Sequence, residues 1–285
     1  MTAAIVYAVG AMICLGLTDI VYKRAAAAGA RPHHFLMVQA WTFAPAIFVY
    51  GLLSGELRLE PAALWGSAVG LCSFISFYNF LRSLRTGSIS INAPIFRLSF
   101  AFTAALAISV FHEPITPFKI AGLVLTLAAV WLLLGSPSKR EADSPRLTAE
   151  SLLQVMIATL FLGLSNFIYK VGLLAGATPV SLLVAQAALF VTLATGFAIV
   201  TDRGVRPART VWNYAPPGGI FLLFGLVFML EGLSRGEASV LVPISQMGFV
   251  VAAVAGFVTM GEPFTARKAG GLVAAIAAII CLAQS

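Results

Sequence analysis

The most regular feature of this chain is an alternation of long apolar stretches with short polar or turn-forming segments. A helix needs about 20 predominantly apolar residues to cross the hydrocarbon of a bilayer. Ten stretches of roughly that length occur, at approximately residues 3–22, 34–54, 62–84, 88–111, 117–135, 151–174, 179–200, 213–234, 237–260 and 265–283. The pattern therefore predicts an all-α protein with ten membrane-spanning helices.

One polar segment divides these stretches into two groups of five. Residues 136–150 contain the run SPSKREADSP, whose Ser, Pro and charged residues are typical of a solvated linker. We therefore expect one unit at residues 1–135 and a second at 151–285. The first apolar stretch is interpreted as a helix and not as a signal peptide, because Lys23 and Arg24 follow it and no basic residue precedes it.

The composition agrees with a protein embedded in lipid. Hydrophobic residues make up 60% of the 285 positions and charged residues 10%, against about 25% charged residues in soluble domains. The net charge is +7, but the 18 Lys and Arg residues form no dense cluster, which argues against a nucleic-acid partner. The three cysteines lie in apolar stretches without metal-ligand spacing, so we expect no metal and no cofactor. The expected partners are the lipid bilayer and a small-molecule substrate, and we expect a functional monomer.

The two halves repeat one another in sequence. A shift of 147 residues places LGLTDIVYK, from Leu15, over LGLSNFIYK, from Leu162, and Gln39 over Gln186. A shift of 149 residues aligns the later parts of the halves: Pro94-Ile95 with Pro243-Ile244, Glu113-Pro114 with Glu262-Pro263, and Lys119 with Lys268. Because each half has an odd number of spans, the second copy enters the membrane from the opposite side. Inverted repeats of this kind are typical of transporters, which place the substrate near the midplane, in a central cavity between the repeats.

These residues also resemble a known family. The Glu-Pro turn after the fourth and ninth spans, the Lys and the Gly-Leu-Val that follow it, and the prolines about 19 residues earlier are similar to the EamA repeat of the drug/metabolite transporter superfamily. The resemblance covers nearly the whole chain. It implies a ten-helix carrier of small metabolites in the bacterial inner membrane, similar to amino-acid exporters such as those of the YddG type.

The basic residues predict an orientation. If the connections alternate sides, four basic residues lie on one side, namely Arg58, Lys119, Lys170 and Arg235, and thirteen lie on the other. The positive-inside rule makes the richer side cytoplasmic, which puts both termini outside. The resemblance implies the opposite, since many EamA-type carriers have cytoplasmic termini. We follow the charges.

Arg97 is the main candidate for substrate binding. It lies near the middle of the fourth span, too deep for its side chain to reach an interface easily. Its repeat counterpart is Gln246 in the ninth span. A guanidinium can hold a carboxylate through two parallel hydrogen bonds, and an amide both donates and accepts, a combination that suits an amino acid. The alternative is a structural role, in which backbone carbonyls or a carboxylate of another helix satisfy Arg97.

Further polar residues extend this candidate site. Pro94 and Pro243 each remove a backbone hydrogen bond three residues before Arg97 and Gln246, so we expect a kink in both helices. The other candidate substrate ligands are polar residues in the spans: Asn92, Ser99, Ser245, Tyr78, Asn79, Gln39 and Gln186. Residues of this kind also bond neighbouring helices. Aromatic residues recur at helical spacing in the third span, for example Phe74 and Phe77, which favours an aromatic or bulky apolar substrate if they face the cavity.

The sequence thus favours a secondary carrier that exports small zwitterionic or anionic metabolites, amino acids first. A multidrug exporter of organic cations is a second possibility, against which Arg97 argues by charge repulsion. An intramembrane lipid-linked transferase and a channel are alternatives of other classes. All carboxylates fall in loops or near predicted helix ends, with Asp19 about a turn from the end of the first span, where it is expected to pair with Lys23. We therefore expect facilitated efflux or exchange without an obligatory proton.

Overall fold

The computed structural model describes the chain except residues 1, 59, 87–88, 135–147, 203–205 and 260–264. Most of the predicted linker thus lies outside the described residues. The described part of the first half forms α1 (Thr2–Ala27), α2 (Pro32–Ser54), η1 (Pro61–Ala63), α3 (Leu64–Thr86), α4 (Ile89–Arg97), α5 (Ser99–Phe111) and α6 (Pro117–Leu134). That of the second half forms α7 (Ala149–Leu174), α8 (Pro179–Asp202), α9 (Arg209–Arg235), α10 (Ala238–Gln246), α11 (Gly248–Thr259) and α12 (Ala266–Ala283).

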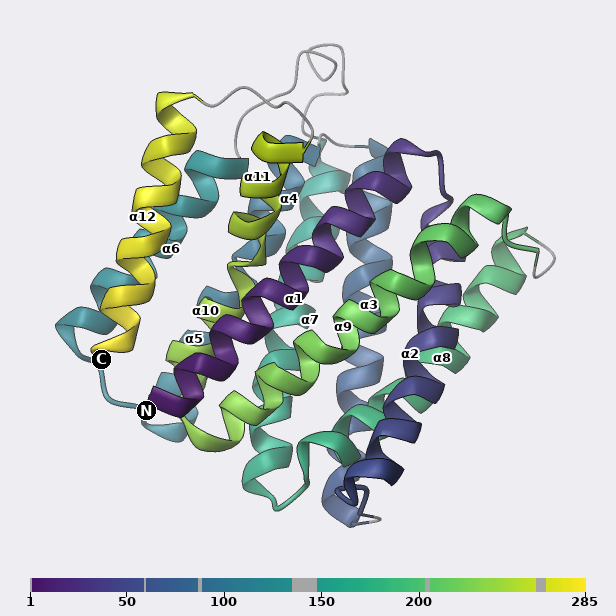
Figure 1. The fold of residues 1–285 in the computed structure, drawn as a ribbon, viewed down its shortest axis with the longest axis horizontal. Helices are drawn as coiled ribbons and strands as arrows, with labels where there is room; N and C mark the ends of the chain where they lie inside the picture. The colour runs from purple at the N-terminus through teal and green to yellow at the C-terminus, as the bar shows by residue number, and fades with distance from the viewer. Residues whose placement is uncertain (1, 59, 87–88, 135–147, 203–205, 260–264) are drawn as a thin grey trace.

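Ten helical segments in the described part of the chain are long and apolar enough to cross a membrane. Two of them are divided in the middle, since α4 and α5 together form the fourth span and α10 and α11 the ninth. The prediction of an all-helical protein with ten spans in two units of five is therefore confirmed. Figure 1 shows both termini at the lower end of the bundle, whereas α6, the last helix of the first half, finishes at the upper end. The second half consequently runs through the bundle in the opposite sense.

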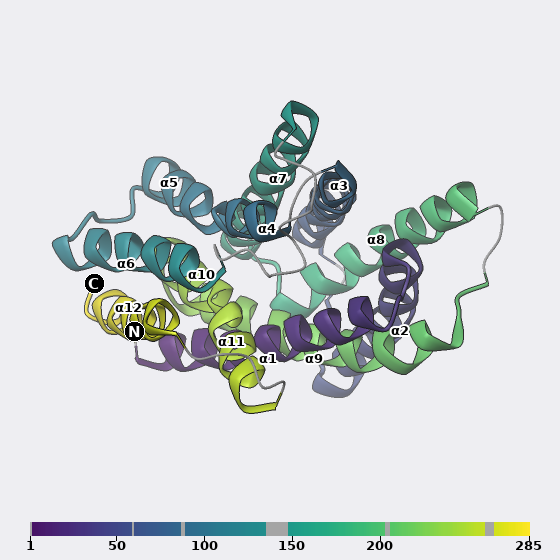
Figure 2. The ribbon, with the colours of Figure 1, turned by 90° about the horizontal axis from the view of Figure 1, so that it is seen from above.

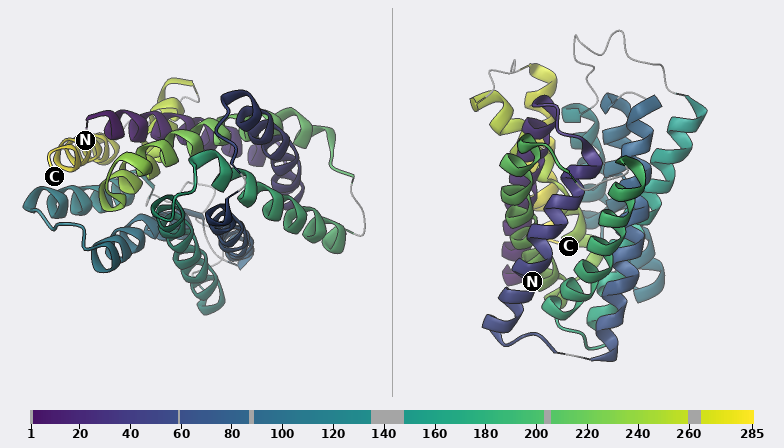
Figure 3. Two further views of the ribbon diagram at one scale, coloured as in Figure 1. Left: turned by 90° about the horizontal axis from the view of Figure 1, so that it is seen from below. Right: turned by 90° about the vertical axis from the view of Figure 1, so that its right-hand side faces the viewer.

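The largest contacts between the two halves occur in repeat-related pairs. Helix α1 packs along α9 just as α7 packs along α3, and α2 contacts α9 as α8 contacts α3. The pairs α2 with α8, α5 with α10, and α6 with α12 join equivalent or nearly equivalent parts of the two halves. Seen from above, α1 and α9 form one row, while α3 and α7 lie on the opposite side of the molecule (Figure 2). The side view in Figure 3 shows the long helices running between the two ends.

The two divided spans bring the ends of α4 and α10 to the middle of the bundle. Helix α4 ends at Arg97 and α10 ends at Gln246, in each case three residues after a proline inside the helix. At both breaks the next amide bonds three residues back: Leu98 N donates to Ile95 O at 3.0 Å, and Met247 N donates to Ile244 O at 3.1 Å. Each proline removes the backbone hydrogen bond to the residue four positions before it, and each helix ends three residues after its proline.

The first helix is longer than the apolar pattern predicts. It continues from Tyr22, the predicted end, to Ala27 through Lys23 and Arg24, because the alanines that follow have high helix propensity. Asp19 therefore lies eight residues before the end of α1, more than two turns inside, and not within a turn of its end. This corrects the expectation that every carboxylate is close to a helix end.

Two glycines allow the helices around the centre to approach closely. A Cβ atom at Gly16 of α1 would lie 2.6 Å from the carbonyl oxygen of Gly248, and one at Gly163 of α7 would lie 2.8 Å from the carbonyl oxygen of Ser99. These glycines occupy equivalent positions in the repeat. Each precedes by three residues a polar residue of the same helix, Asp19 in α1 and Asn166 in α7, and so fixes how far that residue stands from the opposite broken helix.

Candidate functional site

The centre of the molecule holds a charged pair. Arg97, the last residue of α4, donates from Nη2 to Oδ2 of Asp19 in α1 at 2.5 Å, and its Nη1 lies 3.5 Å from Oε1 of Gln246, the last residue of α10. The side chains of Arg97 and Asp19 remain 20% and 23% exposed, and Gln246 is 8% exposed. The two repeat-related residues Arg97 and Gln246 are thus in contact. A carboxylate from another helix satisfies Arg97, as the structural alternative anticipated.

This pair has a neutral counterpart in the second half. The repeat equates Asp19 with Asn166 and Arg97 with Gln246, so the charged residues of one half correspond to two amides in the other. Asn166 is 3% exposed, and its Nδ2 has no hydrogen-bond partner among the described residues. The centre therefore carries one positive and one negative group, both from the first half.

Gln39 and Gln186 make the same contact in the two halves. The hydroxyl of Tyr22 in α1 donates to Oε1 of Gln39 in α2 at 2.9 Å, and the hydroxyl of Tyr169 in α7 donates to Oε1 of Gln186 in α8. Each glutamine thus joins neighbouring helices, the role that polar residues in bilayer helices commonly have. Gln39 nevertheless keeps an unused donor, because its buried Nε2 has no hydrogen-bond partner among the residues described.

Three other predicted ligands serve local structure. Asn92, fully buried, donates from Nδ2 to the carbonyl oxygen of Ser83 at 2.9 Å and to Oγ of Ser151 at 2.9 Å, which ties α4 to α3 and α7. Asn79 donates to Ile75 O of its own helix at 2.8 Å. The carbonyl of Ser99 accepts from Thr103 at 3.0 Å. The contact of Asn79 gives this residue a structural explanation without a ligand, whereas the buried Oδ1 of Asn92 has no hydrogen-bond partner among the described residues.

Two serines beside the central break remain without hydrogen bonds from their hydroxyls. Ser99 and Ser245 are both fully buried, and neither Oγ has a partner in the part of the chain that the structure describes. Ser245 directly precedes Gln246, and Ser99 follows Arg97 by two residues. Buried hydroxyls without partners are uncommon in native structures, which keeps both as candidates.

Aromatic rings extend from the position next to Arg97 towards α8. Phe96 stacks on Phe80 at a centroid distance of 4.2 Å and lies 6.1 Å from Phe77, which in turn is 6.4 Å from Phe190 of α8. Tyr78, another predicted ligand, meets Phe197 of α8 edge-on at 5.0 Å. The aromatic residues of the third span therefore face α8. This row of rings ends at Phe96, which directly precedes Arg97 in the sequence.

Two charged side chains bond the backbone around the α9–α10 junction, at the lower end of the bundle. The Glu113 carboxylate accepts from the backbone N–H groups of Ala238 and Ser239, both at 2.8 Å. Lys170 donates to the carbonyl oxygens of Leu233 and Gly236 at 2.7 and 2.8 Å. A carboxylate suits the start of a helix and an ammonium suits the end of one. Glu113 therefore caps α10 of the other half and not α6, the helix that directly follows it.

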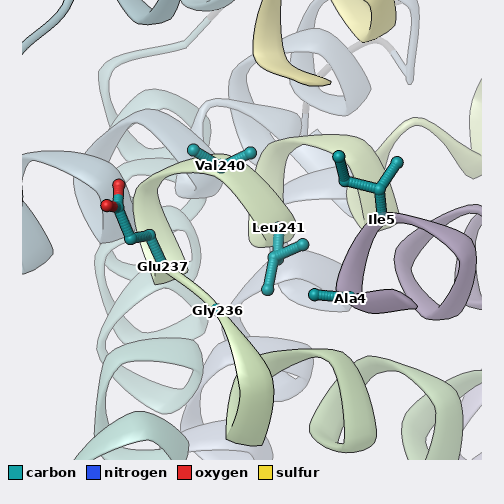
Figure 4. A pocket seen from close by; sticks show the side chains of 6 residues that line it. All are labelled: Ala4, Ile5, Gly236, Glu237, Val240 and Leu241. Carbon is teal, nitrogen blue, oxygen red and sulfur yellow. The ribbon is translucent and has the colours of Figure 1, made fainter. Parts of the chain in front are cut away.

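Lys119 completes this junction cluster, which consists of Glu113, Lys119, Lys170 and Glu237. Its side chain is 1% exposed, forms an ion pair with Glu237 and donates to Pro114 O at 2.7 Å. Beside Glu237 lies a small pocket of about 20 Å³, lined by residues of α10 and of the start of α1 such as Ala4 and Leu241. In Figure 4 Ala4 and Leu241 point towards one another and narrow this pocket. The space is of the order of one water molecule, so the pocket admits no metabolite.

The two equivalent half-helices have different surroundings. All residues of α10 from Val240 to Gln246 are buried. In the equivalent segment of α4, Ile91 is 40% exposed, and Ala93, Ile95 and Arg97 are partly exposed. The lower half of the ninth span is thus enclosed by protein, whereas the upper half of the fourth span is not.

Inverted five-helix units with a polar pair where their broken helices meet define a polytopic membrane protein of the inverted-repeat class. A family model, the EamA-like transporter family, matches residues 2–135 and again residues 150–284. The chain belongs to this family, whose members are membrane transporters and not enzymes. The two matches correspond to the two halves.

The fold is also found in solved structures. One crystal structure, described only as that of a protein, superposes with a TM-score of 0.83 at 16% identity, over 99% of this chain and 96% of the other. At this identity the likeness concerns the fold alone. No curated protein sequence matches the chain significantly.

Sequence reasoning missed the most direct neighbour of Arg97. Asp19 and its counterpart Asn166 stand inside the strongest segment of the repeat, LGLTDIVYK over LGLSNFIYK. A polar residue at the same place in both copies, one turn after a glycine in each, was the available signal. The misplaced end of the first helix hid it.

Proposed function

We propose that this EamA-family protein is a secondary carrier that exports small metabolites, and amino acids first, across the bacterial inner membrane by alternating access. The observation that carries the proposal is the contact of Arg97 with Asp19 and Gln246 where the two broken helices meet. Charged groups are rare within membrane spans and mark substrate pathways. The half-helix ends of inverted-repeat carriers form the substrate site in the same way.

The difference between α4 and α10 supports alternating access. The repeat makes the two half-helices equivalent, yet the junction cluster encloses α10 while α4 keeps exposed positions. A carrier whose substrate site is open only at the α4 end has this asymmetry. If α4 becomes enclosed and α10 becomes exposed, the site opens at the other end. By the charge bias the α4 end is cytoplasmic, so this state accepts a substrate for export.

The aromatic rings next to Arg97 support an aromatic or bulky apolar side chain on the substrate. Phe96 belongs to the ring cluster and precedes the guanidinium directly. Aromatic side chains bury large areas and prefer offset or edge-on contacts with other rings. Contact of the substrate side chain with this cluster would favour aromatic or bulky apolar groups.

Two alternatives make different demands. An exporter of organic cations has to place a cation beside Arg97, although Asp19 offsets part of the repulsion. A lipid-linked transferase needs convergent acid, base or metal groups, and the described residues contain no group of three His, Cys, Asp or Glu side chains able to hold a metal. The family assignment argues against the enzyme.

The decisive experiment is counterflow. Purified protein in liposomes loaded with an unlabelled amino acid should take up the same labelled amino acid transiently, and protein-free liposomes should not. Phenylalanine, alanine and glutamate, tested in parallel with the organic cation tetraphenylphosphonium, separate the substrate classes. Counterflow of the cation alone would refute the amino-acid assignment.

A further inference from the structure

Asp19 is the second charged residue at the centre, and binding of a substrate carboxylate by Arg97 does not by itself explain its presence. It reaches Arg97 from a different helix, at 2.5 Å, and 23% of its side chain stays exposed. A substrate that took only the guanidinium would leave this carboxylate without a cation in a site of low dielectric, which is strongly unfavourable. The pair therefore disfavours a simple anion as the cargo.

We infer that Asp19 binds the ammonium group of the substrate and thereby selects zwitterions over anions and amines of the same shape. The substrate carboxylate accepts two parallel hydrogen bonds from Arg97, and the substrate ammonium donates to the Asp19 carboxylate. Every charge has an opposite neighbour before and after binding, and the site gains no net charge. The inference rests on the proposed function, because it assigns the second charged group of the same cargo.

The neighbours of the pair are suited to this arrangement. Gln246 Oε1 lies 3.5 Å from Arg97 Nη1 and offers a further acceptor to an ammonium that enters between the charges. Gln39 is 3% exposed, with its Oε1 taken by Tyr22 and its Nε2 without a partner among the described residues. Tyr22 follows Asp19 by three residues on α1, so the hydrogen bond from Tyr22 to Gln39 lies on the same side of that helix as Asp19.

The test uses three molecules that share one side chain. L-phenylalanine carries both charges, 3-phenylpropionate lacks the ammonium, and phenethylamine lacks the carboxylate. Their potency is measured in two ways: as competition against counterflow of labelled phenylalanine, and as the rise in unfolding temperature of purified protein in detergent. The second readout remains available for a variant that binds but does not transport. On wild-type protein phenylalanine should be at least about tenfold more potent than either analogue, because each lost contact is a charge-assisted hydrogen bond.

The variants separate the two halves of the cargo. In Asp19→Asn, phenylalanine and 3-phenylpropionate should become equally potent, within about threefold, because only the ammonium contact is lost. In Arg97→Ala, neither carboxylate should bind. The matched control is Glu150→Gln, which changes an exposed carboxylate that pairs with Arg82 at the surface and should leave the order of potencies as in wild type.

Two results overturn the inference. If Asp19→Asn still prefers phenylalanine tenfold, Asp19 does not bind the ammonium. If Asp19→Asn binds neither phenylalanine nor 3-phenylpropionate, as is expected of Arg97→Ala, Asp19 only positions Arg97. A wild-type protein that neither binds nor transports any amino acid contradicts the proposed function itself, a result distinct from both.

Discussion

At the residue scale, the Arg97 guanidinium combines charge with fixed geometry. It contacts one group on α1 and one on α10 through different nitrogens, which a single ammonium cannot do with the same directions. We predict that Arg97→Ala folds but loses most transport of carboxylate-bearing substrates. Arg97→Lys should recover only part, because the two-point contact is gone. Counterflow into liposomes measures both, and unchanged uptake by well-folded Arg97→Ala protein would refute the role in carboxylate binding.

Gln246 makes a weaker contribution to the same contact. Its neutral amide lies 3.5 Å from Arg97 and offers single hydrogen bonds, whereas the guanidinium can bind a carboxylate through charge and two parallel hydrogen bonds. Gln246→Ala should therefore reduce the affinity for the same substrates by less than Arg97→Ala does. The measurement is the half-saturating concentration in counterflow. A loss equal to that of Arg97→Ala would indicate that Gln246 holds the break in the ninth span and does not merely assist binding.

At the scale of helices, the lengths of the apolar stretches and the positions of the prolines predict the spans well. The contacts between helices that are distant in sequence cannot be predicted in this way. The ten spans and the breaks after Pro94 and Pro243 follow from local rules, since length, charge and a missing N–H act within one segment. The Asp19–Arg97 pair does not, because its members are 78 positions apart, on α1 and α4, and meet only through tertiary packing. For the same reason the sequence does not reveal that Glu113 caps α10 of the other half.

The junction cluster leads to a prediction at this scale. Glu113→Ala leaves two backbone N–H groups at the start of α10 without acceptors, and hydrogen bonds to a charged group contribute about 1.5–3 kcal/mol each. The lower end should therefore open more often, and a cysteine at Val240, 4% exposed in this state, should react about tenfold faster with a thiol reagent. The matched control is Glu60→Ala, which removes an exposed carboxylate that pairs with Arg58 at the surface. Equal rates in both variants would mean that the cluster does not hold the end closed.

At the scale of the whole molecule, the inverted repeat does not determine which end faces the cytoplasm, so the distribution of basic residues determines it. The two halves present similar folds to the two sides of the membrane. The fold therefore does not oppose the orientation that the thirteen-to-four distribution of basic residues predicts. We predict that in a background without native cysteines a cysteine at Ala28, between α1 and α2, is shielded from an impermeant thiol reagent in intact cells. One at Glu56, beyond α2 at the other end, should be labelled. Both positions are exposed in the structure, so the reverse pattern would establish cytoplasmic termini.

The same scale decides how transport is coupled to energy. The sequence argument for proton-independent transport assumed that no carboxylate reaches the centre, and Asp19 removes that premise. We make the same prediction on another ground. A zwitterion that replaces the Asp19–Arg97 contact by one contact to each of these residues leaves the charge of the site unchanged, so no proton has to move. We therefore predict counterflow of a neutral amino acid without a pH gradient, and no net accumulation when a gradient is imposed on proteoliposomes. Accumulation that collapses on addition of a protonophore in wild type but is absent in Asp19→Asn would instead make Asp19 the proton carrier of the cycle.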